Sequence, residues 1–276
     1  LSDKYVLSAL INGITHKFTN QIHIMDRRTM LSATGSAAAL TILGGIPLNA
    51  NGQTTATQVS EKDRKKIMVI GAHPDDAETS VGGTICLLTD AGHEVVSVYL
   101  TRGQAGIRGK SHEEAAAIRE QEARAACAIM NARPVFLSQI DGSSEVNRDR
   151  YNEMKELLER EKPDVVITHW PIDGHRDHAN CGILVLSAWR QLNRCFELYY
   201  FEVMSGWQSQ MFHPTDWVDI TTTRERKYKA CYCHESQKLT NVMENWHGPM
   251  ERFRGIECRC KAAEAFAHHT KPVSLV

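Results

Sequence analysis

Two short runs of histidine and aspartate could act together on one substrate. The first run, AHPDD, places His73, Asp75 and Asp76 within one turn, and Pro74 restricts the backbone between them. The second run, DGHRDH, supplies Asp173, His175, Asp177 and His178. Both runs therefore combine the side chains that bind metal ions with side chains that transfer protons.

This combination favours metal-assisted hydrolysis. A catalytic zinc ion takes three nitrogen or oxygen ligands from the protein and leaves one position open for water. The absence of cysteine from both runs argues against a closed structural zinc site. A remaining carboxylate can accept a proton from water, and a remaining histidine can stabilise an oxyanion or protonate a leaving amine.

Each run follows a predicted strand. Continuous apolar segments, typical of buried parallel strands, lie at residues 67–73, 95–103, 134–138 and 164–170. Helical patterns at residues 78–91, 111–131 and 148–161 separate them. This alternation predicts an α/β fold, a Rossmann-like doubly wound, mostly parallel sheet with helices on both faces. In such sheets functional groups gather at the carboxyl ends of the strands.

The rest of the chain divides around this core. After the fourth strand we predict a helix at 178–192, strands at 196–204 and 216–220, and helices at 224–234 and 249–268. Residues 53–65 are polar and aperiodic, which is typical of a linker. We therefore expect one folded domain over residues 66–276.

Residues 25–52 are typical of an export signal. Arg27 and Arg28 precede a weakly apolar stretch rich in Ala, Gly and Thr, and small residues follow. The paired arginines resemble a twin-arginine leader and predict a periplasmic or extracellular protein. The apolar part is too short and interrupted to form a permanent membrane span. A cytoplasmic protein is the alternative, and residues 1–24 are expected to be an upstream extension without assigned function.

The composition excludes an obvious nucleic-acid partner. Among 276 residues, 32 are Lys or Arg and 33 are Asp or Glu, so the formal net charge is −1. This balance offers no electrostatic footprint for nucleic acid. We expect a small-molecule partner instead.

Four motifs together resemble the LmbE/PIG-L family of zinc-dependent N-acetylglucosamine deacetylases. They are AHPDD, TRG at 101–103, HxDH at 175–178 and HESQ at 234–237, and the resemblance spans residues 66 to about 268. TRGQAG resembles a bacterial branch with TRGEAG, although Gln104 replaces the glutamate. The resemblance implies removal of an N-acetyl group from an N-acetylglucosamine-like or related amino-sugar conjugate.

The resemblance also implies roles for single residues. The metal ligands would be His73, Asp76 and His178, and Asp75 would be the general base. The family implies Zn²⁺, although a ligand set of this type also accommodates iron, cobalt or manganese.

Four other residues are candidates near the reaction. By the same resemblance, His175 stabilises the tetrahedral intermediate and Asp177 orients it. Arg102 could bind a substrate oxygen through its planar donors, or pair with a neighbouring acid. His234 could approach the substrate, or interact with a helix end.

Several alternatives stay open. Asp75 or Asp76 could cap the following helix, and His175 and His178 could be surface histidines. A dinucleotide site would need GxGxxG, whereas the turn GAHPDDAETSVGG carries carboxylates that repel phosphate. The same metal site could hydrolyse an ester or another amide. An exported, non-catalytic carbohydrate-binding protein could also retain the scaffold.

The cysteines and some aromatic residues have less specific interpretations. Cys231/Cys233 and Cys258/Cys260 lack the spacing of a four-thiolate zinc site, so we expect apolar packing. Three aromatic residues could stack on a sugar, although core packing is more common: Trp207, Phe212 and Trp217.

Overall fold

The apolar segments form neighbouring strands of one sheet. The computed structural model describes residues 58–270, in which seven strands have the order β3-β2-β1-β4-β5-β7-β6. The strands are β1 (Lys66–Gly71), β2 (Glu94–Thr101), β3 (Arg133–Gln139), β4 (Val165–His169), β5 (Glu197–Phe201), β6 (Asp216–Asp219) and β7 (Ala263–His268). The predicted leader and the upstream extension lie outside the described residues.

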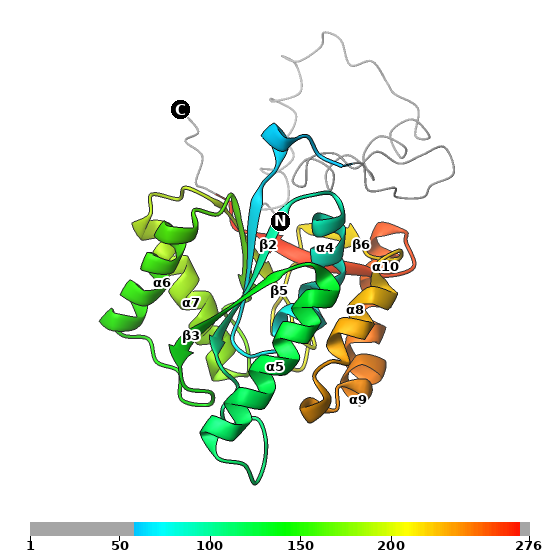
Figure 1. The fold of residues 1–276 in the computed structure, drawn as a ribbon. Helices are drawn as coiled ribbons and strands as arrows, with labels where there is room; N and C mark the ends of the chain where they lie inside the picture. Colours follow the sequence, from blue (N-terminus) through cyan, green and yellow to red (C-terminus); the bar gives the residue numbers. More distant parts are fainter. Residues whose placement is uncertain (1–57, 271–276) are drawn as a thin grey trace, which may run out of the picture. The chain divides into compact units, whose positions relative to one another are not determined.

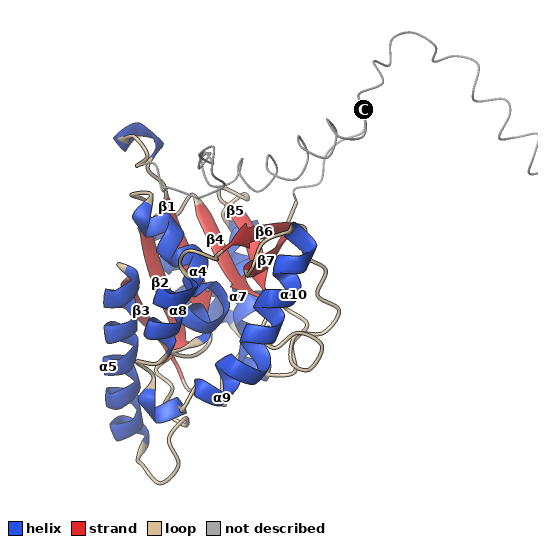
Figure 2. Ribbon diagram, turned by 90° about the vertical axis from the view of Figure 1, so that its right-hand side faces the viewer, coloured by secondary structure: helices blue, strands red, loops and turns tan. Residues whose placement is uncertain are grey.

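Most of the sheet is parallel. Strands β3, β2, β1, β4 and β5 pair in parallel, whereas β7 is antiparallel to both β5 and β6. Figure 2 shows the strands as one continuous layer. The predicted mostly parallel, doubly wound sheet is therefore confirmed.

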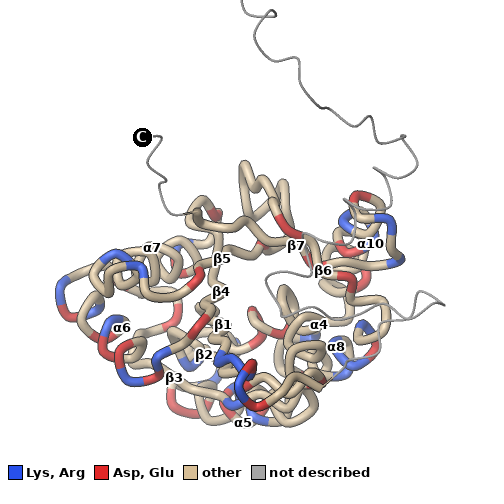
Figure 3. The backbone as a smooth tube through the Cα atoms, turned by 90° about the horizontal axis from the view of Figure 1, so that it is seen from above, with Lys and Arg blue, Asp and Glu red and all other residues tan. Residues whose placement is uncertain are grey.

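Helices cover both faces of the sheet. Figure 1 and Figure 3 show α6 and α7 on one side, with α4, α5 and α8 on the other. The helices are α4 (Asp76–Asp90), α5 (His112–Met130), α6 (Arg148–Glu161), α7 (Arg176–Gln191), α8 (Arg224–Cys231), α9 (Thr240–Val242) and α10 (Gly248–Cys258). The described residues also form short helical turns: the 3₁₀ turns η1 (Glu61–Asp63) and η2 (Glu235–Gln237), and the π-helical turn η3 (Met243–His247).

Strand β1 explains why these apolar runs are continuous. Met68 and Ile70 belong to one core cluster, and Ile67 and Val69 belong to the other. Successive side chains of a strand point to opposite faces, so a strand covered on both faces must be apolar at every position.

The predicted start of α5 is also formed as expected, because Ser111 makes a capping box with Glu114.

One predicted element is wrong. We predicted a helix over 249–268, but α10 ends at Cys258 and residues 263–268 form β7. Alanine and glutamate favour helix locally. Here, however, the segment pairs with strands on both sides, and Glu264 accepts hydrogen bonds from the backbone N–H groups of Gly83 and Thr84. Tertiary pairing overrides the local preference.

Two of the three aromatic residues pack as expected, whereas the paired cysteines do so only in part. Of the four, Cys231 is buried and Cys233, Cys258 and Cys260 are partly exposed, and no four-thiolate cluster is formed within residues 58–270. Phe212 is buried in the core and Trp217 packs against it. Trp207 differs, because 66% of its surface is exposed.

Charged residues of both signs are interspersed on the outer helices in Figure 3. Over the described part of the chain, no helix combines the length and the apolar character that crossing a bilayer requires.

Candidate metal centre and active site

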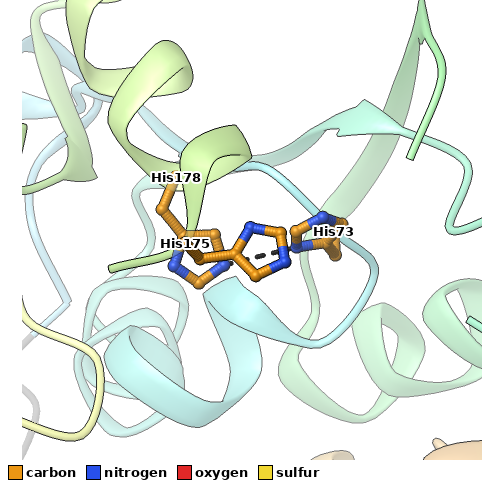
Figure 4. Close-up of side chains that lie close together, drawn as sticks. All are labelled: His73, His175 and His178. Atoms are coloured by element: carbon orange, nitrogen blue, oxygen red, sulfur yellow. Dashed lines mark hydrogen bonds between the residues drawn. The ribbon is translucent and has the colours of Figure 1, made fainter. Parts of the chain in front are cut away.

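The two His/Asp runs meet because their strands are neighbours. Strand β4 pairs in parallel with β1, so the carboxyl ends of both lie at one edge of the sheet. His73 follows β1 and Asp76 begins α4, whereas His178 lies in the first turn of α7. Figure 4 shows His73, His175 and His178 side by side at this edge.

Three buried donor groups face one another. The Nε2 atom of His178 lies 3.3 Å from Nδ1 of His73, the contact dashed in Figure 4. The same Nε2 lies 3.3 Å from Asp76 Oδ1, and His73 Nδ1 lies 3.5 Å from Asp76 Oδ2. Two ligands of a tetrahedral zinc ion with bonds of about 2.1 Å are about 3.4 Å apart. These residues therefore fit the predicted metal.

Hydrogen bonds orient both imidazoles from behind. The Nε2 atom of His73 lies 3.1 Å from Asp177 Oδ2 and 3.2 Å from Asp141 Oδ1. The Nδ1 atom of His178 lies 3.3 Å from Asp173 Oδ1. Carboxylates in this position fix the tautomer of a metal-binding histidine and increase its basicity. One nitrogen of each ring is thereby left to face the shared position.

The Asp76 carboxylate is held in a similar way. Its Oδ2 accepts hydrogen bonds from the backbone N–H groups of Ala72 and His73, and also contacts His169 Nε2 at 3.0 Å. Its Oδ1 is turned toward His178. The Asp76 side chain therefore stabilises the turn that precedes α4 and makes no capping hydrogen bond to that helix.

The electrostatics favour a cation at this position. Burial opposes the charge on His178, yet the Asp76 and Asp173 carboxylates raise its pKa to about 9. Burial also opposes charge on Asp76, but His178 and His169 hold its pKa well below the usual range. Positive charge is thus stabilised among buried carboxylates, and a metal ion can take the place of the protons.

Other donor combinations lie nearby. The donor atoms of His73, His175 and His178 lie within 4.8 Å of one another, as do those of Asp76, His169 and His178. Each of these two combinations shares two residues with the predicted ligand set, so His175 or His169 could add a fourth donor. A third combination, His73 with Asp141 and Asp177, shares only His73.

Asp75 lies beside the donors in a strained conformation. Its φ is 130°, which is unusual for a residue other than glycine and is often found at active sites. Its carboxylate makes no capping bond to α4 but lies 2.8 Å from Arg119 Nη2. Burial raises the pKa of Asp75, Arg119 opposes this change, and Asp76 adds to it. The carboxyl group thus has properties suited to proton transfer.

His175 lines the same cavity. Its ring centroid lies 4.7 Å from those of both His73 and His178. Its Nδ1 accepts a hydrogen bond from the backbone N–H of Asp177, which leaves the proton of the neutral ring on Nε2. The Asp177 carboxylate contacts His73 and Ser144, so this structure orients His175 through the Asp177 backbone and not through the expected side chain.

The two predicted substrate contacts do not line the cavity. Arg102 pairs with Glu120 and lies 3.5 Å from Glu113, the ion-pair alternative considered above. His234 is fully buried, and its Nε2 lies 3.7 Å from Glu78 Oε1. The HESQ motif reaches the cavity through Gln237 instead.

Arg119 is a site residue that the sequence interpretation missed. It lies on the buried alanine-rich face of α5 and donates to the Pro74 carbonyl as well as to Asp75. The glycines of TRGQAG make room for it: a Cβ on Gly103 would lie 2.6 Å from Arg119 Cδ, and one on Gly106 would also collide with the guanidinium. The TRG loop therefore supports Asp75 indirectly. The sequence signal that could have identified Arg119 is an arginine on a helix face otherwise formed by alanines.

Gln104 connects this loop to the end of β3. Its Oε1 accepts from the backbone N–H of Arg102 and of Asp141, and its Nε2 donates to the carbonyl of Gln139. A glutamate could not make the last bond. The departure from TRGEAG thus suits this chain, and it places Asp141 at the cavity.

The opposite wall of the cavity comes from later segments. Its residues follow β5 or α8, and Gln237 alone among them belongs to one of the four motifs: Val203, Met204, Gln208, Gln237, Leu239, Val242 and His247. Gln208 contacts His178 Nδ1 at 2.9 Å. His247 is buried, and its Nδ1 has no hydrogen-bond partner among the described residues.

Comparisons with known proteins identify the family of this chain. The family model for PIG-L, described as GlcNAc-PI de-N-acetylase, matches residues 68–189. The diacetylchitobiose deacetylase of Thermococcus kodakarensis is 32% identical over 200 residues, covering 67% of this chain and 74% of that protein. The chain belongs to the PIG-L family. The family match contains all three predicted metal ligands.

Solved structures show the same fold. The N,N'-diacetylchitobiose deacetylase from Pyrococcus horikoshii has a TM-score of 0.65 and 27% identity, covering 75% of this PIG-L chain and 84% of that chain. GalB, the 4-carboxy-2-hydroxymuconate hydratase from Pseudomonas putida KT2440, has a TM-score of 0.67 and 21% identity. The match covers 76% of this chain and 98% of that chain. The fold thus occurs with more than one reaction, and the site must decide the function.

Proposed function

We propose that this protein is a zinc-dependent deacetylase that hydrolyses the N-acetyl group of an N-acetylglucosamine-like sugar or a related amino-sugar conjugate. The observation that carries the proposal is the convergence of His73, Asp76 and His178 beside Asp75 in one open cavity. The deacetylase names of the two diacetylchitobiose relatives support the same reaction class.

The ligands would be His73 Nδ1, His178 Nε2 and the Asp76 carboxylate. A bound zinc ion supplies a Lewis acid for the amide carbonyl and lowers the pKa of water. The protein keeps these donors in place through the hydrogen bonds behind them, so little reorganisation is needed when the ion binds.

Asp75 accepts the proton of the attacking water and returns it to the nitrogen of the leaving amine as the C–N bond breaks. Its raised pKa brings the carboxylate closer to the range in which a general base works well, and Arg119 fixes its orientation. His175 donates a hydrogen bond from Nε2 to the developing oxyanion. Burial lowers the pKa of His175, and His178 and His73 lower it further, so the donor is a neutral imidazole.

The substrate would enter beside polar groups that can bond sugar hydroxyls. Asp141 and Gln208 both line the cavity, the first in contact with His73 and the second with His178. A site with a few convergent polar groups in a concave surface is typical of small-molecule recognition.

Acetate release tests the proposal directly. We expect the purified protein to release acetate from N-acetylglucosamine or N,N'-diacetylchitobiose, to lose this activity with a chelator, and to regain it with zinc. Elemental analysis and reconstitution with iron, cobalt or manganese would identify the preferred metal. Cleavage of esters or other amides alone, hydration of an unsaturated acid, or binding without turnover by the metal-loaded protein would each contradict the proposal.

We also propose that the protein is exported through residues 25–52. The support is Arg27 and Arg28 ahead of the short apolar stretch. Replacing both arginines with lysine should leave the protein in the cytoplasmic fraction, whereas unchanged export of the variant would contradict this localisation.

A further inference from the structure

Two tryptophans form an exposed pair. The rings of Trp207 and Trp246 have centroids 5.5 Å apart and planes inclined by 32°. Trp207 is 66% exposed and Trp246 is 40% exposed. Neither indole N–H donates a hydrogen bond within the described residues, whereas those of Trp170, Trp189 and Trp217 do. Large apolar side chains exposed in this way are often binding sites.

The pair belongs to two segments that wall the cavity, although neither ring is part of the lining itself. Trp207 comes from the connection after β5, between Met204 and Gln208, which both line the cavity. Trp246 lies in η3, between Val242 and His247, which line it too. Two wall segments that are distant in sequence therefore meet at this ring contact. In Figure 1, α9 lies at the end of the domain where the parallel strands finish.

An unpaired polar group follows Trp246 in the sequence. His247 directly follows Trp246 and is only 1% exposed, and its Nδ1 has no hydrogen-bond partner among residues 58–270. A buried polar atom without a partner costs free energy unless a ligand or water satisfies it. Its position in the cavity lining indicates that a bound ligand places a polar group beside His247.

We propose that Trp207 and Trp246 form a stacking subsite for a second sugar ring, linked to the ring whose acetamido group is hydrolysed. This inference rests on the proposed deacetylase function. It implies that the preferred substrate is a di- or oligosaccharide rather than a single sugar.

The surroundings favour a sugar over a lipid chain. A sugar presents an apolar C–H face for an aromatic ring and hydroxyl groups around its edge, so its site needs both kinds of neighbour. Glu244 and Asn245 precede Trp246 and are exposed, and Ser205 lies close to Trp207 in sequence. An acyl chain would instead need a continuous apolar surface, which these polar residues interrupt.

Kinetics with two substrates test the subsite. In Trp207→Ala and Trp246→Ala, we expect kcat/KM for N,N'-diacetylchitobiose to fall about three- to tenfold, the range of a lost aromatic contact. The value for N-acetylglucosamine should stay within twofold of the parent enzyme. Phe253→Ala is the matched control, because Phe253 is 55% exposed on α10 and none of residues 249–257 around it lines the cavity.

Equal losses for both sugars, or no loss for either, would overturn the inference. So would a change of sedimentation in the two tryptophan variants, since the pair would then be a contact between copies of the chain. Binding to phosphatidylcholine vesicles that depends on both tryptophans, without discrimination between the sugars, would also overturn it.

A binding measurement separates this inference from the proposed function. Metal-loaded Asp75→Asn protein can be titrated with both sugars while tryptophan fluorescence is recorded. We expect a larger fluorescence change and a three- to tenfold tighter Kd for the disaccharide, with both differences reduced by Trp207→Ala. Acetate release without this preference would contradict only the subsite. Disaccharide-specific binding to an enzyme that releases no acetate would contradict only the deacetylase function.

Discussion

The two sides of the cavity are built in different ways. At the carboxyl edge of β1 and β4, the Asp76 and Asp177 carboxylates each bond to several partners, and the donor atoms lie within 3.5 Å of one another. The opposite wall consists of a long connection, a 3₁₀ turn, a three-residue helix and a π-helical turn. It carries His247, whose Nδ1 has no hydrogen-bond partner in the described part of the chain, and an exposed tryptophan pair.

This contrast indicates that the two sides of the cavity have different functions. Groups held by a parallel sheet and its helices can be positioned precisely enough for metal binding and proton transfer. Segments outside the sheet can change length and side chains at little cost to the core. We therefore expect variants at the sheet edge to affect the metal and turnover, and variants in the wall to affect substrate choice.

The largest effect is expected for His178→Ala. Loss of one of three protein ligands should leave little zinc after dialysis, and acetate release should become undetectable. Zinc content by elemental analysis is the measurement. His213→Ala is the matched control, because His213 is exposed and does not line the cavity. A fully zinc-loaded His178→Ala protein would mean that the ligand assignment is incorrect.

Asp75→Asn should separate turnover from metal binding. The amide keeps the size of the side chain but cannot accept the proton, so kcat should fall about 10²- to 10⁴-fold while the zinc content is retained. Asp76→Asn, changed one position later, should lose zinc. If Asp75→Asn contained no zinc and Asp76→Asn were fully loaded with zinc, Asp75 would be the metal ligand and Asp76 the general base.

Arg119→Gln should change the pH profile. The guanidinium lowers the pKa of Asp75, so its removal should raise that pKa. A general base works when it is deprotonated, and the acid limb of kcat/KM against pH should therefore move to higher pH. Arg102→Gln is the control, because Arg102 pairs with Glu120 outside the cavity lining. An unshifted limb in Arg119→Gln would show that the ion pair does not tune the base.

The smallest effect is expected in the wall. His247→Gln should raise KM about two- to tenfold, the cost of one lost hydrogen bond, with zinc content unchanged. The measurement is KM for N,N'-diacetylchitobiose beside elemental analysis. A loss of zinc in this variant would remove the distinction between the two sides of the cavity.

Much of this protein can be predicted from local sequence. Continuous apolar runs correctly identified the parallel strands, and the capping pattern at Ser111 correctly placed the start of α5. The two His/Asp runs could be assigned to one edge because parallel strands end on the same side of a sheet. These features depend on neighbouring residues, so the sequence by itself determines them.

Other features depend on contacts between distant segments. Residues 263–268 have the composition of a helix but form β7, since β5 and β6 offer hydrogen bonds on both sides. The Asp177 carboxylate bonds to His73 and not to its neighbour His175, and Arg119 reaches Asp75 from α5. The pairing of Trp207 with Trp246 is of the same kind. Only the tertiary structure decides these contacts, because they depend on which strands and helices become neighbours in space.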